Sequence, residues 1–204
     1  MNKKLLYAIV SLIIFVGIFL IVIFGNHSLD LKISDAMSNI NNYSSSFFIF
    51  LGNYSNFIMI AIALLFLGIF ISRKRKKQGF IFALALICGF AIEKGIKFLF
   101  ERQRPTGQLI QDLENSFPSG HATFAVILFS LMIYFYKDEI KDKFRKNFFI
   151  VANILLILFV GFSRLYINAH WFSDVLAGFA LGFFVLNIIL FVFYKKKPNL
   201  SKHL

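Results

Sequence analysis

The chain has 204 residues, of which 58% are hydrophobic and 29 are Phe, and its formal net charge is +12. A mean hydropathy of +0.74 is too high for an ordinary soluble domain, so the composition indicates a polytopic membrane protein. The basic residues fall in short clusters between apolar segments, which favours a role in membrane orientation and argues against nucleic acid as a partner.

Six apolar segments follow one another along the chain, each suited to a membrane helix. After the first, Leu29, Ile33 and Met37 recur at helical spacing, which predicts either a short helix on the membrane surface or an ordinary loop helix. We expect one all-α domain over residues 1–204, with six transmembrane helices and a short interfacial helix after the first span. The predicted spans cover roughly residues 5–24, 53–72, 79–100, 119–136, 147–166 and 173–194.

Clusters of Lys and Arg mark one side of this six-span arrangement. They occur before the first span, between the second and third, between the fourth and fifth, and in the tail after the sixth. Because cytoplasmic loops carry an excess of Lys and Arg, we expect the N- and C-termini in the cytoplasm. The polar segments at residues 101–117 and 163–174 then face the extracytoplasmic side.

A polar island at residues 163–174 interrupts the apolar sequence. It contains Arg164, His170 and Asp174, and such groups are costly near a bilayer unless they serve a function. If the chain is helical from His170 onward, Asp174 lies four residues later on the same face, where its carboxylate can orient the imidazole. His170 then offers its other nitrogen as a nucleophile, while Arg164 offers donors suited to phosphate oxygens.

Two cations near the end of the third span extend this anion site. Lys97 and Arg104 are seven residues apart, so a continued third helix would point both the same way, and Pro105 would then end that helix. Glu93 and Lys94, in the same span, are expected to form a buried polar contact or to contribute to the site.

The segment that leads into the fourth span has the features of a helix N-terminus. Ser119 is a natural helix cap, and Gly120 allows backbone amides to approach a bound group. Free amides at a helix N-terminus bind anions. His121, in the same turn, can donate a proton to a leaving oxygen.

Together these three segments resemble the signature of the type 2 phosphatidic acid phosphatase (PAP2) superfamily. Residues 97–105 read KxxxxxxRP, residues 118–121 read PSGH, and residues 163–174 read SRxxxxxHxxxD. All signature positions match in the family's order, and the six-span layout is similar to that of its integral-membrane lipid phosphatases. Three motifs on one membrane side make the resemblance specific.

The resemblance implies a role for each matching residue. His170 is expected to be the nucleophile that forms a phosphohistidine, Asp174 its orienting partner, and His121 the acid that protonates the leaving alcohol. The residues expected to bind the phosphate are Lys97, Arg104, Ser119, Gly120 and Arg164. Phosphoryl transfer needs positioning and charge neutralisation above all, so three cations and helix amides can supply both without a metal or another cofactor.

The expected function is metal-independent hydrolysis of a membrane lipid phosphate: phosphatidic acid, phosphatidylglycerol phosphate or a polyprenyl diphosphate. The lipid substrate and the bilayer are the expected partners. One alternative is a related transferase that passes the phosphoryl group to another acceptor, and another is an anion transporter or channel. Zinc bound by His121, His170 and Asp174 is disfavoured, because no further ligand is convincingly placed.

Overall fold

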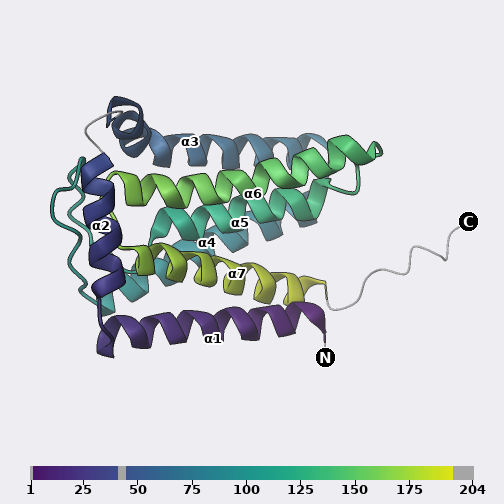
Figure 1. Ribbon diagram of the computed structural model, residues 1–204. Coiled ribbons are helices and arrows are strands. Elements are labelled where there is room, and N and C mark those ends of the chain that lie inside the picture. The colour runs from purple at the N-terminus through teal and green to yellow at the C-terminus, as the bar shows by residue number, and fades with distance from the viewer. Residues whose placement is uncertain (1, 41–44, 195–204) are drawn as a thin grey trace, which may run out of the picture.

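The computed structural model describes residues 2–40 and 45–194, and these residues form seven α-helices. Six of them lie side by side as a bundle, and the remaining helix, α2, crosses one end of it (Figure 1). The helices are α1 (Lys3–Phe24), α2 (Ser28–Ile40), α3 (Ser45–Ser72), α4 (Lys76–Leu99), α5 (Gly120–Tyr136), α6 (Lys143–Tyr166) and α7 (Phe172–Phe193). The predicted all-α polytopic fold is confirmed.

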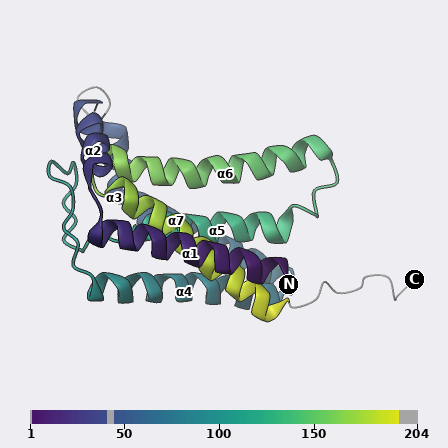
Figure 2. The same ribbon diagram turned by 60° about the horizontal axis from the view of Figure 1, so that its bottom comes forward.

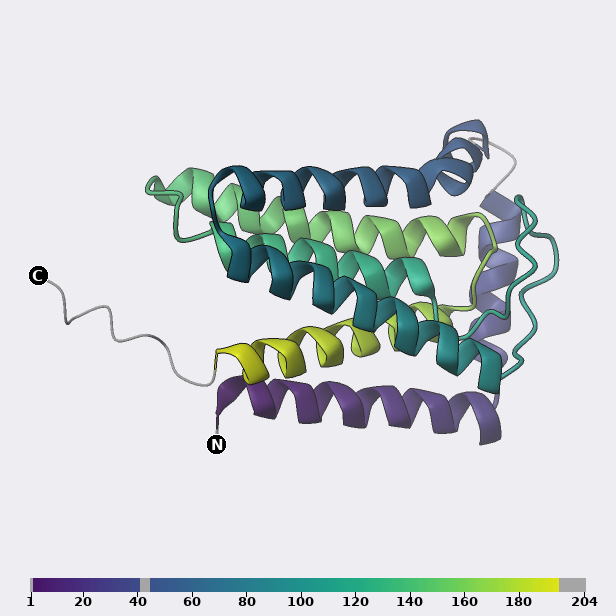
Figure 3. The same cartoon turned by 180° about the vertical axis from the view of Figure 1, so that it is seen from behind.

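Helix α5 forms the centre of the bundle. Within the described residues, five helices are long and apolar enough to cross a membrane, whereas α5 is apolar but has only 17 residues. It packs against α4, α6 and α7 (Figure 3). Its side chains from Ala125 to Leu128 are fully buried, so this short helix is shielded from lipid by its neighbours.

Helix α7 approaches α5 through two glycines one turn apart, Gly178 and Gly182. A Cβ atom at Gly178 would lie 2.5 Å from the carbonyl oxygen of Ser119, and one at Gly182 would lie 2.8 Å from that of Thr123. Small residues let helix backbones approach closely inside a membrane. The Thr123 hydroxyl also donates to the Gly178 carbonyl at 3.1 Å. This contact fixes the start of α7 relative to the start of α5.

Two helices begin earlier than the predicted spans. Helix α3 starts at Ser45 and continues through Gly52, whose missing side chain leaves room for Ile110. Helix α6 starts at Lys143, because Asp142 Oδ1 caps it by accepting a hydrogen bond from a backbone N–H of the first turn at 2.8 Å. Charged residues therefore extend α6 before its apolar stretch, whereas the added turns of α3 are mostly apolar.

The two ends of the bundle differ in chemistry. At one end the first and last described helices meet, and Lys4 Nζ donates to the Tyr194 carbonyl at 3.1 Å. The same end carries an ion pair between Arg73 and Glu139 at 2.9 Å. Helix α2 and the loop between α4 and α5 lie at the opposite end (Figure 2). The basic tail of the sequence, at residues 195–197, is outside the described residues.

Candidate active site

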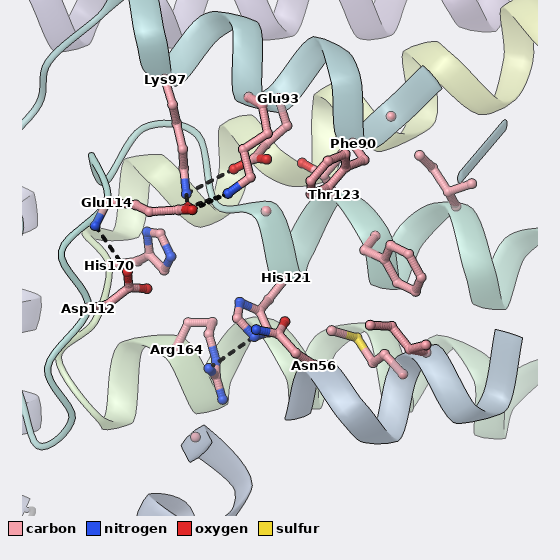
Figure 4. A pocket seen from close by; sticks show the side chains of 18 of the residues that line it. Asn56, Phe90, Glu93, Lys97, Asp112, Glu114, His121, Thr123, Arg164 and His170 are labelled. Atoms are coloured by element: carbon pink, nitrogen blue, oxygen red, sulfur yellow. Dashed lines mark hydrogen bonds and ion pairs between the residues drawn. The ribbon is translucent and has the colours of Figure 1, made fainter. Parts of the chain in front are cut away.

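A cavity of about 510 Å³ lies between α3, α4, α5 and α6 (Figure 4). Five of the eight predicted site residues line it: Lys97, Gly120, His121, Arg164 and His170. They come from α4, α5, α6 and the connection between α6 and α7. Segments that are far apart in the sequence thus converge on one cavity, and both imidazoles reach it.

The two ring nitrogens of His170 have different neighbours. Nε2 is 3.3 Å from Arg104 Nη1. A guanidinium can only donate, so this contact is a hydrogen bond in the tautomer that has its lone pair on Nε2 and its proton on Nδ1. Nδ1 lies 3.5 Å from Asp174 Oδ2. The free lone pair of His170 is therefore held beside a cation that can bind phosphate.

The pairing of Asp174 with His170 does not depend on a helix that starts at His170, and that expectation was wrong. Helix α7 begins at Phe172, and Asp174 Oδ2 accepts a hydrogen bond from the backbone N–H of Trp171 at 2.9 Å. Asn168, with φ of 55°, turns the chain just before this point, a conformation that Asn tolerates better than most residues. The turn, and not helical spacing, places the imidazole near the carboxylate.

His121 lies in the first turn of α5, and its Nε2 faces two neighbours. Ser55 Oγ is 2.9 Å away, and Arg164 Nη1 is 3.4 Å away. Ser55 comes from α3, and no motif in the sequence singles it out. Arg164 is 1% exposed, and its Nη2 is buried without a hydrogen-bond partner among the described residues. An unpartnered guanidinium nitrogen beside a cavity suits an anionic oxygen.

Ser119 and Gly120 start helix α5. The Ser119 side chain is fully buried and accepts a hydrogen bond from the backbone N–H of Ala122, so it caps the helix behind the cavity wall. Gly120 lines the cavity, where a Cβ atom would lie 2.8 Å from Glu93 Oε1. Glycine at this position lets the helix start next to a buried carboxylate.

The cations Lys97 and Arg104 are paired with carboxylates. Lys97 Nζ lies 2.8 Å from Glu93 Oε1 and 3.2 Å from Glu114 Oε2. Arg104 Nη2 lies 2.7 Å from Asp112 Oδ2. The α4–α5 loop thus places two acidic side chains, Asp112 and Glu114, on the groups predicted to bind phosphate. Neither acid was predicted as part of the site.

Arg104 reaches this region by a different route from the one predicted. Helix α4 ends at Leu99 and the backbone at Phe100 is extended, so Arg104 does not follow Lys97 on a continued helix. Its guanidinium instead donates to two carbonyls, that of Glu114 at 2.7 Å and that of Ala169 at 2.5 Å. These bonds hold the loop and the α6–α7 connection together, and they direct the side chain toward His170.

The expected contact between Glu93 and Lys94 is not formed. Successive residues of a helix point in different directions, so Glu93 faces the interior and pairs with Lys97, one turn later. Lys94 instead pairs with Glu114 of the α4–α5 loop. Both Glu93 and Lys94 line the cavity, and a contribution of either to the site stays a prediction.

Burial and neighbouring charges set the ionisation of the site groups that lie outside the helices. Burial above all, and then Arg104 and Lys97, hold the pKa of His170 well below its usual range. The hydrogen bond from Lys94 lowers the pKa of Glu114. His170 is therefore neutral at pH 7, the form in which it can attack phosphorus, while Glu114 is ionised.

The fold and the cavity define a class: a polytopic membrane protein with a buried imidazole among cations suited to phosphate. In the part of the chain that the structure describes, no three His, Cys, Asp or Glu side chains form a group able to hold a metal ion. The cations and the helix start that border the cavity are groups that can position and neutralise a phosphoryl group.

Comparison with known proteins identifies the family. The sequence model of the PAP2 superfamily matches residues 45–198. Phosphatidylglycerophosphatase B of Bacillus subtilis is 31% identical over 138 residues, which are 66% of this chain and 67% of that protein. Lipid A 1-phosphatase of Porphyromonas gingivalis is 37% identical over 89 residues, which are 44% of this chain and 18% of that protein.

A solved structure extends the comparison to the fold. The crystal structure of a transmembrane PAP2-type phosphatidylglycerolphosphate phosphatase from Bacillus subtilis matches with a TM-score of 0.77 and 25% sequence identity, and the match covers 98% of this chain and 100% of that one. The chain belongs to the PAP2 superfamily. It is a multi-pass membrane protein and a lipid phosphatase of this family.

Proposed function

We propose that this protein hydrolyses the phosphate of a membrane lipid through a phosphohistidine on His170, with phosphatidylglycerol phosphate as the first candidate substrate. The Bacillus subtilis relative and the Bacillus subtilis crystal structure are both named for activity on that lipid, which favours it over phosphatidic acid and polyprenyl diphosphate. The observation that carries the proposal is the position of His170 Nε2, 3.3 Å from Arg104 Nη1 in a cavity shared with Lys97, His121 and Arg164.

The proposed reaction has two steps. In the first, the His170 Nε2 lone pair forms a bond to phosphorus, the bond from phosphorus to the lipid oxygen breaks, and His121, which enters the step protonated, gives that oxygen a proton. In the second, His121 takes a proton from water, the water oxygen attacks phosphorus, and the phosphorus–nitrogen bond breaks. Lys97, Arg104 and Arg164 neutralise the phosphoryl oxygens throughout.

The inner part of the cavity suits the apolar part of a lipid. Its walls include Met59 and Ile60 of α3, Leu86 and Phe90 of α4, and Phe124 of α5. The charged residues gather at the other end, where α2 crosses the bundle (Figure 4). A phosphate at the charged end would leave an acyl chain beside the apolar walls, so a lipid matches both halves better than a soluble phosphate ester does.

We infer that the site faces away from the cytoplasm and that both termini face the cytoplasm. The end of the bundle opposite the site carries Lys4, Arg73 and Arg75, and it continues into a charged α5–α6 connection. An excess of Lys and Arg marks the cytoplasmic side of membrane proteins. Labelling of single cysteines placed in the α4–α5 loop and the α5–α6 connection of intact cells tests this orientation.

The test of the function is phosphate release by purified protein from a panel of lipid phosphates and diphosphates in detergent. His170→Ala is expected to abolish release, and Asp174→Asn is expected to slow it severely while the protein stays folded. His27→Ala is the matched control, because His27 is an exposed histidine at the start of α2. Vanadate, which mimics five-coordinate phosphorus, is expected to inhibit competitively.

Three outcomes would overturn the proposal. Wild-type protein that binds lipid phosphates but releases no phosphate, with no phosphate trapped on His170 after acid-free quenching, would favour an anion transporter. Strong inhibition by EDTA that zinc reverses would replace the proposed mechanism by a metal-dependent one. Formation of a phosphorylated alcohol in place of free phosphate would identify a transferase.

A further inference from the structure

Helix α2 is amphipathic, and the residue that it buries is an acid. Of its 13 residues only Asp30 is buried, at 6% exposure, while Leu29 and Leu31 on either side are exposed. An interfacial helix usually buries apolar side chains and leaves its charges outside. Asp30 therefore lies under the helix for a reason other than hydrophobic packing.

The partner of Asp30 is Arg102, in the loop after α4. Arg102 Nη2 lies 2.7 Å from Asp30 Oδ2. The other terminal nitrogen of the same guanidinium, Nη1, donates to Asp174 Oδ1 and, at 2.8 Å, to Ser173 Oγ. Asp30 also accepts hydrogen bonds from the Ser173 backbone N–H at 2.9 Å and from its hydroxyl at 2.6 Å. One guanidinium thus joins two buried carboxylates from α2 and α7.

This network lies behind the catalytic pair and outside the cavity. Arg102 and Asp30 do not line the cavity, and both terminal nitrogens of Arg102 already bind carboxylates. Asp174, whose side chain is 0% exposed, uses Oδ1 for Arg102 and keeps Oδ2 for the Trp171 backbone and for His170 Nδ1 at 3.5 Å. Arg102 also stacks over the Trp171 ring, 5.6 Å from its centroid. Each contact restricts the rotation of the Asp174 carboxylate.

We propose that Arg102, anchored by Asp30, is a positioning residue that fixes the Asp174 carboxylate and through it the tautomer and orientation of His170. A planar guanidinium suits this task, because it presents a separate terminal nitrogen to each carboxylate in a fixed geometry. The inference rests on the proposed roles of His170 and Asp174, and it gives α2 a part in the reaction although α2 contributes no group to the cavity.

Kinetics separate positioning from substrate binding. Arg102→Met is expected to lower kcat about 100-fold, the cost of a misplacement of about 1 Å in a catalytic group, and to change KM by less than about twofold. Asp30→Asn should lower kcat less, because the Arg102–Asp174 contact remains. Asp35→Asn is the matched control, since Asp35 is an exposed acid on the same helix. A rise in KM with kcat unchanged would mean that Arg102 binds substrate, and would overturn the inference.

A double variant tests whether Arg102 acts through Asp174. When Asp174→Asn is already present, Arg102→Met should slow the reaction by no more than about twofold further, because energies of coupled residues are not additive. A full additional loss would show that Arg102 acts independently. Should Arg102→Met fail to fold, Arg102→Lys retains a charge but replaces the two terminal nitrogens of the guanidinium by one, so the same cycle can be measured with it.

A second measurement does not require activity. The chain has four histidines, so ¹⁵N spectra of histidine-labelled protein, assigned by single substitutions, can report the tautomer of His170. We expect the Nδ1–H form in the wild type and in Asp35→Asn, and a mixture of tautomers in Arg102→Met. A single unchanged tautomer in Arg102→Met would refute the positioning role. If the wild type released no phosphate from any lipid, the proposed function would fail while this spectrum still decided the role of Arg102.

Discussion

Substitution of Gly178 by Ala tests whether the contact between α5 and α7 sets the geometry of the site. The added Cβ atom would lie 2.5 Å from the Ser119 carbonyl oxygen and 2.9 Å from Ala122 Cβ, whereas ordinary contacts begin at 3.4 Å. One neighbour is backbone, so α7 must move by about 1 Å to relieve the overlap. The Ser119 N–H, which donates to the Asp174 carbonyl at 3.0 Å, lies at the same contact.

The expected result combines moderate destabilisation with a large loss of rate. Overpacking of a tight interface typically costs about 1–3 kcal/mol, and a shift of about 1 Å between catalytic groups can cost about 100-fold in kcat. Phosphate release and thermal unfolding in detergent measure the two effects. Gly95→Ala on α4 is the control, because a Cβ atom there meets nothing within 4 Å. Gly178→Ala protein with the kcat and unfolding temperature of the wild type would refute this account of the site.

Two further predictions follow from the charges of the site. Glu114→Gln removes a carboxylate from Lys97, so KM for the lipid phosphate and the inhibition constant of vanadate should both fall. The decrease should be no more than about fivefold, because a half-exposed ion pair contributes only ~1 kcal/mol. An increase in both constants would contradict this prediction. The pKa of His170 in the folded protein lies below its unfolded value of about 6.5. The unfolded chain therefore binds more protons in acid, and the folded state loses stability as the pH drops. Between about pH 7.5 and about pH 5.5 this group should lower the free energy of unfolding by ~1 kcal/mol. His170→Gln should reduce that pH dependence of the unfolding temperature, and an unchanged slope would contradict the assignment.

The parts of the structure that follow from local patterns could be predicted from the sequence. Apolar runs long enough to span a bilayer predicted the helices, and the helix cap at Ser119 follows from its residue type. The lysine and arginine clusters between spans predicted which polar segments share one end of the bundle. That placement is why Lys97, His121, Arg164 and His170 could be assigned to one cavity before any coordinates were known.

The parts that depend on contacts across the chain could not be predicted. Asp30 and Arg102 are 72 residues apart, and neither stands at a spacing that marks a partnership. Ser55 likewise reaches His121 from another helix. Helical spacing was also a poor guide to Arg104, because the chain leaves α4 at Leu99 and hydrogen bonds within the loop decide where its guanidinium lies. A signal that could have directed attention to Asp30 is an acid flanked by leucines in an amphipathic helix.

On the proposed function, the carboxylates on Lys97 and Arg104 make phosphate binding an ion exchange. A dianion that enters must displace Glu114 and Asp112 from their cations before it gains the same interactions, so the electrostatic gain is only the difference between two sets of counter-ions. A small free anion has little else to offer, whereas a lipid also brings hydrocarbon to the apolar walls. Because inorganic phosphate lacks the hydrocarbon part of the lipid, it binds more weakly and leaves the site, which is then free for the next lipid.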